Sequence, residues 1–324
     1  MLTVIAAALS GRISHVQART PASAAPTTAQ QISDAERQAC FGAATRDPGR
    51  PCVNARLRTE VVPDPGQAPT LPNTPCTLVA GSPDVCEFGV AADRATQTVA
   101  LVGDSHAGHW RGALEVVARA HRWHGVSITH TSCPLSKAVR NLSGQDRFGA
   151  CVRWKREVFG WFHRHPEIHT IFVAGLSGGV GVFPSAGRTR FETSVAGYRA
   201  AWRALPRSVH HIVVIRDTPK MRWTTNACVA RAAAQGRAPG TACAVPRSAR
   251  LDPDPLVTAA RRLHSPRVQV VDLTRLFCGE SSCYPVIGGA LVFRDENHMT
   301  AVFSATLGPF LRRAVDGLMA GWRS

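Results

Sequence analysis

A serine that could act as a nucleophile follows the first strongly apolar run of the chain. The run 99–102 has the length and composition of a buried strand, and Gly103-Asp104-Ser105 comes directly after it. A helical pattern begins at once, with apolar residues at 110, 113, 114 and 117 on one face. A hydroxyl at such a turn lies at the positive end of the helix dipole, which favours negative charge forming beside it. Ser105 is therefore either a nucleophile or only the N-cap of the helix, a role that serine also fills.

An aspartate and a histidine near the C-terminus have the spacing of a catalytic pair. Asp295 and His298 lie three residues apart before the last helical pattern, so on a helical turn both side chains project the same way. A carboxylate placed there can hold the imidazole in one tautomer and leave its other nitrogen to take a proton from Ser105. Alone, Asp-x-x-His is most often a surface feature. Together with Gly-Asp-Ser after a core strand, it indicates a Ser-His-Asp triad.

These two motifs belong to an ordered set that resembles one known superfamily. Gly103-Asp104-Ser105 and Asp295-x-x-His298 resemble the first and last motif blocks of the SGNH (GDSL-like) esterases and acyltransferases. The chain is most similar to the extracytoplasmic SGNH domain that is associated with membrane acyltransferase-3 proteins. The matching stretches are LVGDSHAGHW (101–110), SCP (132–134), RDTP (216–219), the pair Cys278 and Cys283 with the following YPVIG (284–288), and FRDENHMT (293–300). The resemblance extends over roughly residues 38 to 318.

The resemblance implies an extracytoplasmic O-acyltransferase domain. Ser105 would carry an acyl group, expected to be acetyl, and pass it to a hydroxyl of a cell-envelope polysaccharide or glycolipid. A membrane acyltransferase-3 module, in the same polypeptide or a separate one, would supply the acyl group from acetyl-CoA or another acyl-CoA, while the domain itself would bind no metal and no cofactor. The same triad also fits an esterase that deacylates such a glycan. A third interpretation is a non-catalytic domain that binds the cell wall through its positive charge.

From residue 97 onward, apolar runs alternate with amphipathic helical patterns. Strands are predicted at 98–102, 126–130, 168–174, 209–215 and 267–272, and helices at 105–121, 151–165, 191–205, 254–264 and about 300–320. This alternation indicates an α/β fold in which helices cover both faces of a five-stranded, mainly parallel sheet. The resemblance implies the same three-layer α/β/α sandwich, of the SGNH, flavodoxin-like type. In such sheets ligands bind beyond the carboxyl ends of the strands, where Ser105 lies.

Acyl transfer also requires hydrogen-bond donors for the oxyanion, and here the sequence departs from the superfamily. The superfamily has a glycine after its second strand and an asparagine after its third, whereas this chain has TSC (131–133) and the glycine-rich turn 175–179. Backbone N–H groups could substitute, since glycine permits close approach. The candidate donors are the N–H groups of Ser105, Ser132, Gly175 and Ser177. The turn 175–179 is equally typical of a flexible loop.

Two further residues are candidates for an acceptor pocket. Asp217 follows the fourth predicted strand in Asp-Thr-Pro, where it either lines the pocket or forms a turn. Arg294 precedes the triad aspartate. It either directs a sugar hydroxyl or an acidic group, or pairs with a surface carboxylate.

The ten cysteines fall into neighbouring pairs along the chain. They do not form the repeated Cys-x-x-Cys or Cys/His pattern of a structural zinc site, so disulfides in an oxidising compartment are the better interpretation. Proximity predicts the pairs Cys40–Cys52, Cys76–Cys86, Cys133–Cys151, Cys228–Cys243 and Cys278–Cys283. Each would close a short loop, and a disulfide across a loop of about 15 residues contributes up to roughly 3 kcal/mol.

Composition and charge bound the class of protein. With 324 residues, 44% of them hydrophobic, the chain can bury one large core and carry a smaller extension. Its formal net charge is +16, yet no nucleic-acid-binding motif accompanies this charge. We therefore expect no nucleic acid partner, and a general affinity of the surface for anionic polymers or membranes.

Three regions are predicted along the chain. Residues 1–37 begin with a short apolar run and continue as an Ala-, Thr-, Pro- and Gln-rich segment, so we expect a remnant of a membrane helix or a disordered linker. Residues 38–94, with two cysteine pairs and many prolines, are expected to form a disulfide-linked N-terminal extension, and residues 95–324 the SGNH catalytic domain. The resemblance and the apolar N-terminus together predict an extracytoplasmic location, tethered to the cytoplasmic membrane.

Overall fold

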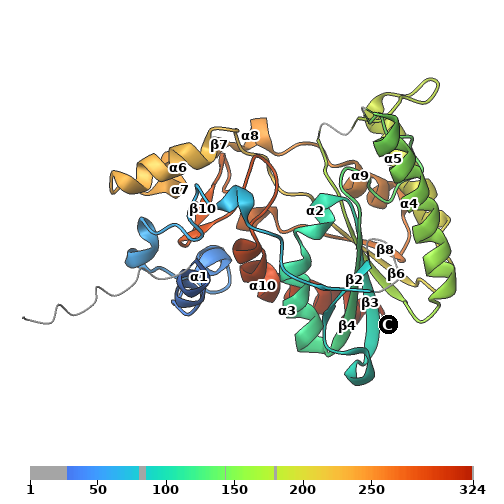
Figure 1. Cartoon of the computed structure of the whole chain (residues 1–324), viewed down its shortest axis with the longest axis horizontal. Coiled ribbons are helices and arrows are strands. Elements are labelled where there is room, and N and C mark those ends of the chain that lie inside the picture. Colours follow the sequence, from blue (N-terminus) through green and yellow to red (C-terminus); the bar gives the residue numbers. More distant parts are fainter. Residues whose placement is uncertain (1–27, 80–84, 143, 179–180, 323–324) are drawn as a thin grey trace, which may run out of the picture.

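A twisted seven-stranded sheet forms the centre of the protein (Figure 1). The computed structural model describes residues 28–79, 85–142, 144–178 and 181–322. The strands, in chain order, are β1 (Thr77–Leu78), β2 (Val85–Gly89), β3 (Gln97–Gly103), β4 (Trp123–Thr129), β5 (Thr170–Ala174), β6 (His211–Ile215) and β8 (Val268–Val271). Across the sheet they are ordered β1-β2-β4-β3-β5-β6-β8. The five from β4 to β8 in this order are parallel, and β1 and β2 form an antiparallel edge.

The α/β class and the mainly parallel sheet agree with the prediction, but the sheet has seven strands where five were predicted. The five predicted strands correspond to β3, β4, β5, β6 and β8. The two additional strands come from the segment 38–94, which was expected to form an extension. These strands are short and lie among prolines and cysteines, so they carry little of the periodicity on which strand prediction depends.

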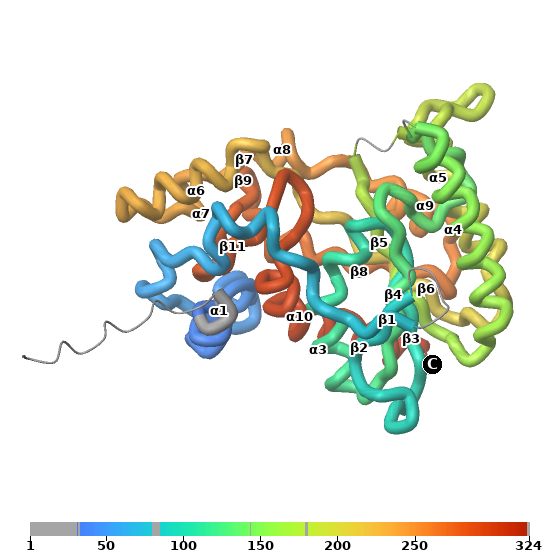
Figure 2. The backbone as a smooth tube through the Cα atoms, in the orientation of Figure 1, coloured from blue at the N-terminus to red at the C-terminus, as the bar shows by residue number. Residues whose placement is uncertain are grey.

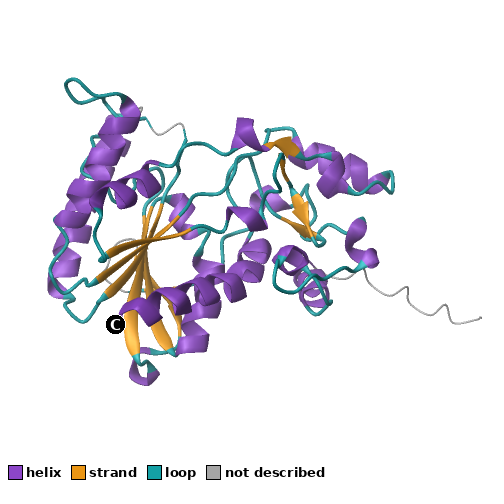
Figure 3. Ribbon diagram, turned by 180° about the vertical axis from the view of Figure 1, so that it is seen from behind, coloured by secondary structure: helices purple, strands orange, loops and turns teal. Residues whose placement is uncertain are grey.

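Helices cover both faces of the sheet (Figure 3). The helices on one face are α3 (Arg111–His121) and α10 (Ala301–Trp322), and those on the other are α4 (Gln145–Arg164), α5 (Arg190–Arg203) and α9 (Pro255–Leu263). Along the central strand β3, Val99 and Leu101 pack toward α3 and α10, while Ala100 and Val102 pack toward α4 and α5. Burial on both faces explains why this strand is a continuous apolar run.

The helix boundaries differ from the predicted ones at two places. The predicted helix 105–121 is divided into α2 (Ser105–Gly108) and α3, and the predicted helix 151–165 begins earlier, at residue 145. In the part of the chain that the structure describes, no helix has both the length and the apolar character needed to cross a membrane.

A smaller lobe packs beside the sheet and is built from residues 28–75, 223–250 and 278–292 (Figure 2). Its N-terminal elements are α1 (Thr28–Glu36), η1 (Gly42–Arg46), η2 (Ala55–Arg58) and η3 (Ala68–Thr70). Its later elements are α6 (Thr225–Ala234), α7 (Pro239–Ala242), β7 (Val245–Pro246), α8 (Arg247–Arg250), β9 (Ser282–Cys283), β10 (Val286–Ile287) and β11 (Ala290–Leu291). Two short 3-10 turns outside the lobe are η4 (Ala92–Arg94) and η5 (Thr274–Leu276).

The two halves of the lobe are joined by backbone hydrogen bonds. The N–H of Gly42 donates to the carbonyl of Gly288 (2.9 Å), and that of Val62 donates to the carbonyl of Gly289 (2.8 Å). Gly288 has φ +52°, and a Cβ there would lie 2.6 Å from the carbonyl oxygen of Gly42, so a side chain would clash. Residues 1–27 of the predicted membrane remnant or linker lie outside the described residues. Residues 28–36, predicted as part of the same linker, form helix α1.

The ten cysteines form five disulfides, and these are the five pairs predicted from proximity. They are Cys40–Cys52, Cys76–Cys86, Cys133–Cys151, Cys228–Cys243 and Cys278–Cys283. Cys76–Cys86 links the segment before β1 to β2, and Cys133–Cys151 links the loop after β4 to α4. The second of these fixes a loop that leaves the carboxyl edge of the sheet, where a site is expected.

Candidate active site

The turn between β3 and α2 holds the side chain of Ser105 at the surface of an otherwise buried segment. Ser105 is the one residue between 101 and 110 that is not buried. Gly103 has φ +153°, and a Cβ at this position would lie 2.0 Å from the carbonyl oxygen of Ala174 in β5. Only glycine therefore lets β3 turn this close to β5. The carboxylate of Asp104 caps α2 by accepting the backbone N–H of His106 at 2.9 Å.

A second loop brings a histidine and an aspartate to this serine, although 193 positions separate the histidine from it. Nε2 of His298 lies 2.9 Å from Oγ of Ser105, and Nδ1 of His298 lies 2.8 Å from Oδ2 of Asp295. The loop holds its own shape, because Oδ1 of Asp295 also accepts the backbone N–H groups of Asn297 (3.0 Å) and His298 (2.8 Å). The structure thus brings together the three residues that the sequence predicts as a triad.

The charge on Asp295 fixes the tautomer of His298. Burial alone would raise the pKa of Asp295, but the hydrogen bonds from the His298 ring and from the backbone N–H groups of Asn297 and His298 lower it to about 2. The carboxylate is therefore ionised at neutral pH and accepts a hydrogen bond from the Nδ1–H of His298. Nε2 then carries the lone pair, and it faces the hydroxyl of Ser105, as general-base activation of a nucleophile requires.

A second histidine–aspartate pair lies beneath the first and is fully buried. Nδ1 of His106 lies 2.6 Å from Oδ1 of Asp217, and both side chains are 1% exposed. Nε2 of His106 faces Oδ1 of Asn297 at 3.3 Å. The ring of His106 has its centroid 5.0 Å from that of His298. The residue that follows the serine is thereby connected to the loop that carries His298.

Both ring nitrogens of His106 face hydrogen-bond acceptors, so an environment of this kind favours a ring with a proton on each nitrogen. Burial alone would lower the pKa of His106, but the charge and hydrogen bond of Asp217 raise it to about 9. For Asp217, burial acts to raise the pKa, while His106 and the backbone N–H of Ser177 outweigh it and lower the pKa. At neutral pH the two residues form a buried ion pair of imidazolium and carboxylate.

Two more buried carboxylates join the loops that follow β5 and β6. Oδ2 of Asp104 accepts the backbone N–H of Leu176 (3.1 Å), and Oδ2 of Asp254 accepts that of Asp217 (2.9 Å). Burial raises the pKa of both Asp104 and Asp254, that of Asp254 to about 6, despite these hydrogen bonds. The turn at Ser105 and the loops after β5 and β6 are thereby held in one polar network.

One group of buried side chains has the composition of a metal site. His106, His109 and Asp217 each offer one ligand atom, and these atoms lie within 4.8 Å of one another. Protonated His106 has no lone pair to give, since both of its nitrogens face acceptors. Nδ1 of His109 accepts the backbone N–H of Met299 (3.3 Å), and burial lowers its pKa well below the usual value, so it stays neutral. This donor set fits an ion pair beside a neutral histidine rather than a metal ion.

The four predicted oxyanion donors are in different situations. The backbone N–H of Ser177 already donates to Oδ2 of Asp217 (2.7 Å). Ser132 is exposed in the loop after β4 and has φ +60°, and Gly175 is buried at the end of β5. Ser105 begins α2, with its N–H at the helix N-terminus. The N–H groups of Ser105, Ser132 and Gly175 remain candidates, and residue 179 of the predicted turn lies outside the described residues.

The two predicted acceptor-pocket residues are engaged within the protein. Asp217 is 4% exposed and bonds to His106, so the structure does not present it to an acceptor. Nη1 of Arg294 donates to the carbonyl of Leu71 (3.0 Å), and its Nε lies 3.7 Å from Oδ2 of Asp295. Arg294 thus links the triad loop to the smaller lobe and places a positive charge beside the triad carboxylate.

Sequence reasoning did not assign His106 or Asn297 to the site. Each lies within a quoted motif: His106 directly follows Ser105, and Asn297 directly precedes His298. Their positions in these motifs were an available signal. Their pairing was not, because His106 meets Asp217 across 111 positions of sequence.

Comparisons with known proteins agree with this geometry. A family model described as "SGNH domain (fused to AT3 domains)" matches residues 72–313. A search of curated proteins found no match. Among solved structures, the fold is similar to the periplasmic domain of the lipopolysaccharide acetyltransferase of Salmonella ser. Paratyphi A, with a TM-score of 0.50 and 10% sequence identity over 70% of this chain and 90% of that one. Because the family model covers most of the chain, the protein belongs to the family of SGNH domains that occur fused to AT3 domains.

Proposed function

We propose that the protein is a serine-dependent O-acyltransferase. One observation carries this proposal, namely the continuous contact from Asp295 through His298 to the hydroxyl of Ser105 at a strand-to-helix turn. Family membership supports an enzyme of the SGNH type. The structural neighbour is named as an acetyltransferase domain, which favours transfer of an acetyl group.

The reaction would proceed through an acyl-serine. Nε2 of His298 takes the hydroxyl proton as Oγ of Ser105 attacks the carbonyl carbon of the acyl donor. The tetrahedral oxyanion collapses, the bond to the donor's leaving group breaks, and His298 returns the proton to that group. A sugar hydroxyl then gives its proton to His298 and attacks the acyl-serine, and the serine regains its proton as it leaves. The carboxylate of Asp295 stabilises the imidazolium in both halves of the reaction.

Family membership supports a proposal for the source of the acyl group and for the location. An AT3 module, in the same polypeptide or as a partner, would carry the acyl group across the cytoplasmic membrane from acetyl-CoA or another acyl-CoA. The acceptor would be a hydroxyl of a cell-envelope polysaccharide or glycolipid. Five disulfides and a periplasmic structural neighbour support an extracytoplasmic site of action.

Hydrolysis is the second candidate function, and the exposure of the triad favours it. The side chains of His298 and Asp295 are 25% and 41% exposed, so water can reach the proposed acyl-serine. Without an acceptor, the same residues would act as an esterase. Whether water or a sugar takes the acyl group depends on the acceptor that occupies the site.

The first experiment is release of nitrophenol from p-nitrophenyl acetate by the purified, oxidised protein, with and without envelope polysaccharide. We expect turnover that requires Ser105, rises with the polysaccharide and leaves acetyl on the sugar. Turnover that requires Ser105 but does not respond to polysaccharide would identify an esterase. Turnover that persists unchanged in Ser105→Ala would contradict both functions.

A further inference from the structure

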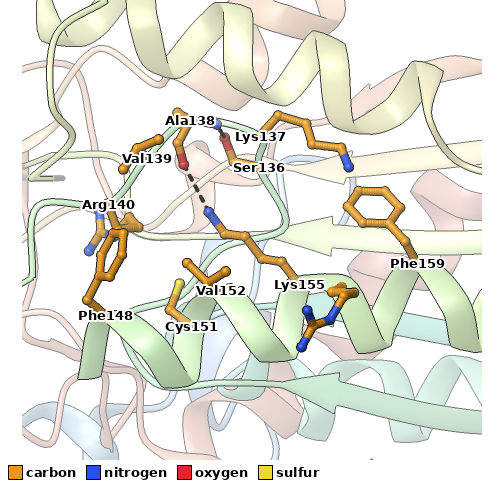
Figure 4. Close-up of a pocket in the computed structure, with 11 residues that line it drawn as sticks. Ser136, Lys137, Ala138, Val139, Arg140, Phe148, Cys151, Val152, Lys155 and Phe159 are labelled. Atoms are coloured by element: carbon orange, nitrogen blue, oxygen red, sulfur yellow. Dashed lines mark hydrogen bonds between the residues drawn. The ribbon is translucent and has the colours of Figure 1, made fainter. Parts of the chain in front are cut away.

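A pocket of about 350 Å³ lies between the loop 136–140 and one face of α4 (Figure 4). The disulfide Cys133–Cys151 ties this loop to the helix, and Nζ of Lys155 reaches up from α4 to the carbonyl of Ala138 at 2.9 Å. The lining contains none of the proposed triad residues. The pocket is therefore a separate feature with its own chemistry.

The pocket is lined by four cationic side chains and, among the described lining residues, by no carboxylate. The cations are Lys137, Arg140, Lys155 and Arg156. The ammonium of Lys137 lies 3.8 Å from the centre of the Phe159 ring (Figure 4). Like charges that line one pocket repel one another, and an anion between them would relieve this repulsion.

Arg140 has a buried donor without a partner among the described residues. The residue is 7% exposed, and its Nε donates to the carbonyl of Ser132 at 2.9 Å. Its Nη1 is buried and has no hydrogen-bond partner among the residues that the structure describes. Burial lowers the pKa of Arg140, and the negative charge of Asp104 partly offsets this. Because this donor is closed off from solvent, Arg140 contributes positive charge to the pocket rather than a hydrogen bond to a bound ligand.

Lys155 has spare donors in the same pocket. Its ammonium has three N–H groups, and the structure shows one acceptor for them, the carbonyl of Ala138. Burial, followed by the charges of Arg140 and Lys137, lowers the pKa of Lys155 to about 8. An anion in the pocket would raise this pKa again and keep Lys155 charged at and above pH 8.

The rest of the lining is apolar and open. Val139, Phe148 and Val152 are 51%, 37% and 48% exposed, respectively, although each is large enough to favour burial. An aromatic ring beside aliphatic side chains suits the apolar face of a sugar ring. The combination of cations and apolar surface selects for a sugar that carries a negative group.

The loop that forms the pocket starts at the edge of the sheet where Ser105 lies. The backbone N–H of His130, just after β4, donates to the carbonyl of Gly103 at 3.1 Å, two residues before the serine. The loop continues through Ser132, whose carbonyl Arg140 holds. The loop therefore connects the catalytic turn to the pocket through the buried segment 133–136.

We propose that this pocket binds an acidic sugar, with its carboxylate or phosphate on the ammonium of Lys155, in the positive field of the other three cations, and its ring against Phe148 and Val152. The proposal of a binding site depends only on the residues that line the pocket. Its assignment as a subsite for the acyl acceptor rests on the proposed function.

The test of binding uses Ser105→Ala, so that no acyl transfer is required. Isothermal titration calorimetry at about 0.15 M salt, which screens the net charge of the chain, compares oligogalacturonate, phosphorylated maltotetraose and neutral maltotetraose. We expect the two anionic probes to bind at least tenfold more tightly than the neutral one, and their ratio shows whether carboxylate or phosphate is preferred. At pH 8, titrations in buffers of different ionisation enthalpy should show proton uptake by Lys155 on binding.

Matched variants separate the pocket from the general positive charge of the surface. Lys155→Gln should weaken binding of the anionic probe about tenfold or more and abolish the proton uptake. Lys137→Gln, which changes an exposed side chain, should weaken binding severalfold without affecting the fold. Arg153→Gln removes the same charge from an exposed position of α4 outside the pocket and should change the affinity less than twofold. Equal losses in Arg153→Gln and Lys155→Gln, or equal affinity for the neutral probe, would overturn the site.

The acceptor assignment has its own readout. With Ser105 intact and an acidic oligosaccharide as acceptor, Lys155→Gln should raise KM for the acceptor about tenfold and leave kcat within twofold. Loss of binding with no change in KM would refute the acceptor role while leaving the site in place. Failure of all acyl transfer, with binding as predicted, would refute the proposed function and not the pocket.

Discussion

Two histidine–aspartate pairs lie side by side in this protein and differ in their surroundings. In the pair His298–Asp295 the side chains are 25% and 41% exposed, while in the pair His106–Asp217 both are 1% exposed. In each pair Nδ1 of the histidine contacts the carboxylate, at 2.8 Å and 2.6 Å. The chemical groups and the contact are the same, so the residue types alone do not decide the role of a pair.

The two pairs differ in the group that faces Nε2, the second ring nitrogen of each histidine. Nε2 of His298 faces the hydroxyl of Ser105, a group that can donate a proton to it, whereas Nε2 of His106 faces Oδ1 of Asn297, which can only accept one. His106 therefore keeps its proton, and its pKa is raised to about 9. The exposed pair is suited to exchanging protons with a substrate, and the buried pair to holding a fixed charge beside it.

Removing the exposed histidine should have the largest effect on catalysis. We expect His298→Ala to lower kcat for ester turnover by about 10⁴-fold or more, because Nε2 of His298 is the group that faces the hydroxyl of Ser105 and can take its proton. The free energy of unfolding should change by less than about 1 kcal/mol, since a histidine–carboxylate hydrogen bond this exposed contributes little. Steady-state kinetics and urea unfolding measure the two quantities.

His163→Ala is the matched control for that variant, because His163 lies exposed on α4, outside the site. It should retain full activity. A residual rate in His298→Ala within tenfold of the unsubstituted protein would contradict the role assigned to the exposed pair.

Breaking the buried pair should instead act on stability. His106→Gln leaves the carboxylate of Asp217 buried without its cation, so we expect a loss of about 3 kcal/mol or more in the free energy of unfolding. The double variant His106→Gln, Asp217→Asn removes both charges and should recover part of that loss. Urea denaturation of the single and double variants tests this order. A single variant as stable as the unsubstituted protein would show that no buried ion pair exists there.

The pH dependence of stability should distinguish the two pairs further. The pKa of His106 is raised from 6.5 to about 9 in the folded protein, so its contribution is complete below pH 6.5 and is lost as pH rises through 9. The stability advantage of the unsubstituted protein over His106→Gln should therefore shrink by up to about 3 kcal/mol between these values. Lys155, whose lowered pKa acts in the opposite direction near pH 8, is present in both proteins and cancels in the difference. An advantage that stays constant across this range would refute the raised pKa.

The sequence predicted the exposed pair and missed the buried one for a physical reason. Asp295 and His298 lie within one turn, so their spacing alone orients both side chains, and the Gly-Asp-Ser motif supplied the third member. Asp217 was selected because it ends a strand at the correct edge of the sheet. Whether a polar residue at that edge faces solvent or a buried histidine depends on loops from distant parts of the chain, and spacing does not contain this information.

The same distinction holds for the fold. Continuous apolar runs identified β3, β5 and β6, because strands buried on both faces carry a strong local signal. The edge strands β1 and β2 and the smaller lobe depend on disulfides and on backbone contacts between residues 42–62 and 288–290. These backbone contacts join segments more than 200 positions apart, and the local sequence gives no sign of them.

Removing the contact between the two pairs should have the smallest effect on catalysis. Oδ1 of Asn297 lies 3.3 Å from Nε2 of His106, on the loop that carries His298, so Asn297→Ala removes one long hydrogen bond and leaves both pairs otherwise intact. A bond of this kind contributes about 0.5–1.5 kcal/mol, and we expect kcat to fall about threefold to tenfold with little change in KM. Glu296→Ala, a neighbouring exposed side chain, is the control and should leave kcat unchanged. If Asn297→Ala lowers kcat as far as His298→Ala does, the two pairs act as one unit, and the division between an exchanging pair and a fixed charge does not hold. An effect confined to the predicted range means that His106 orients the catalytic loop and that the chemistry belongs to His298.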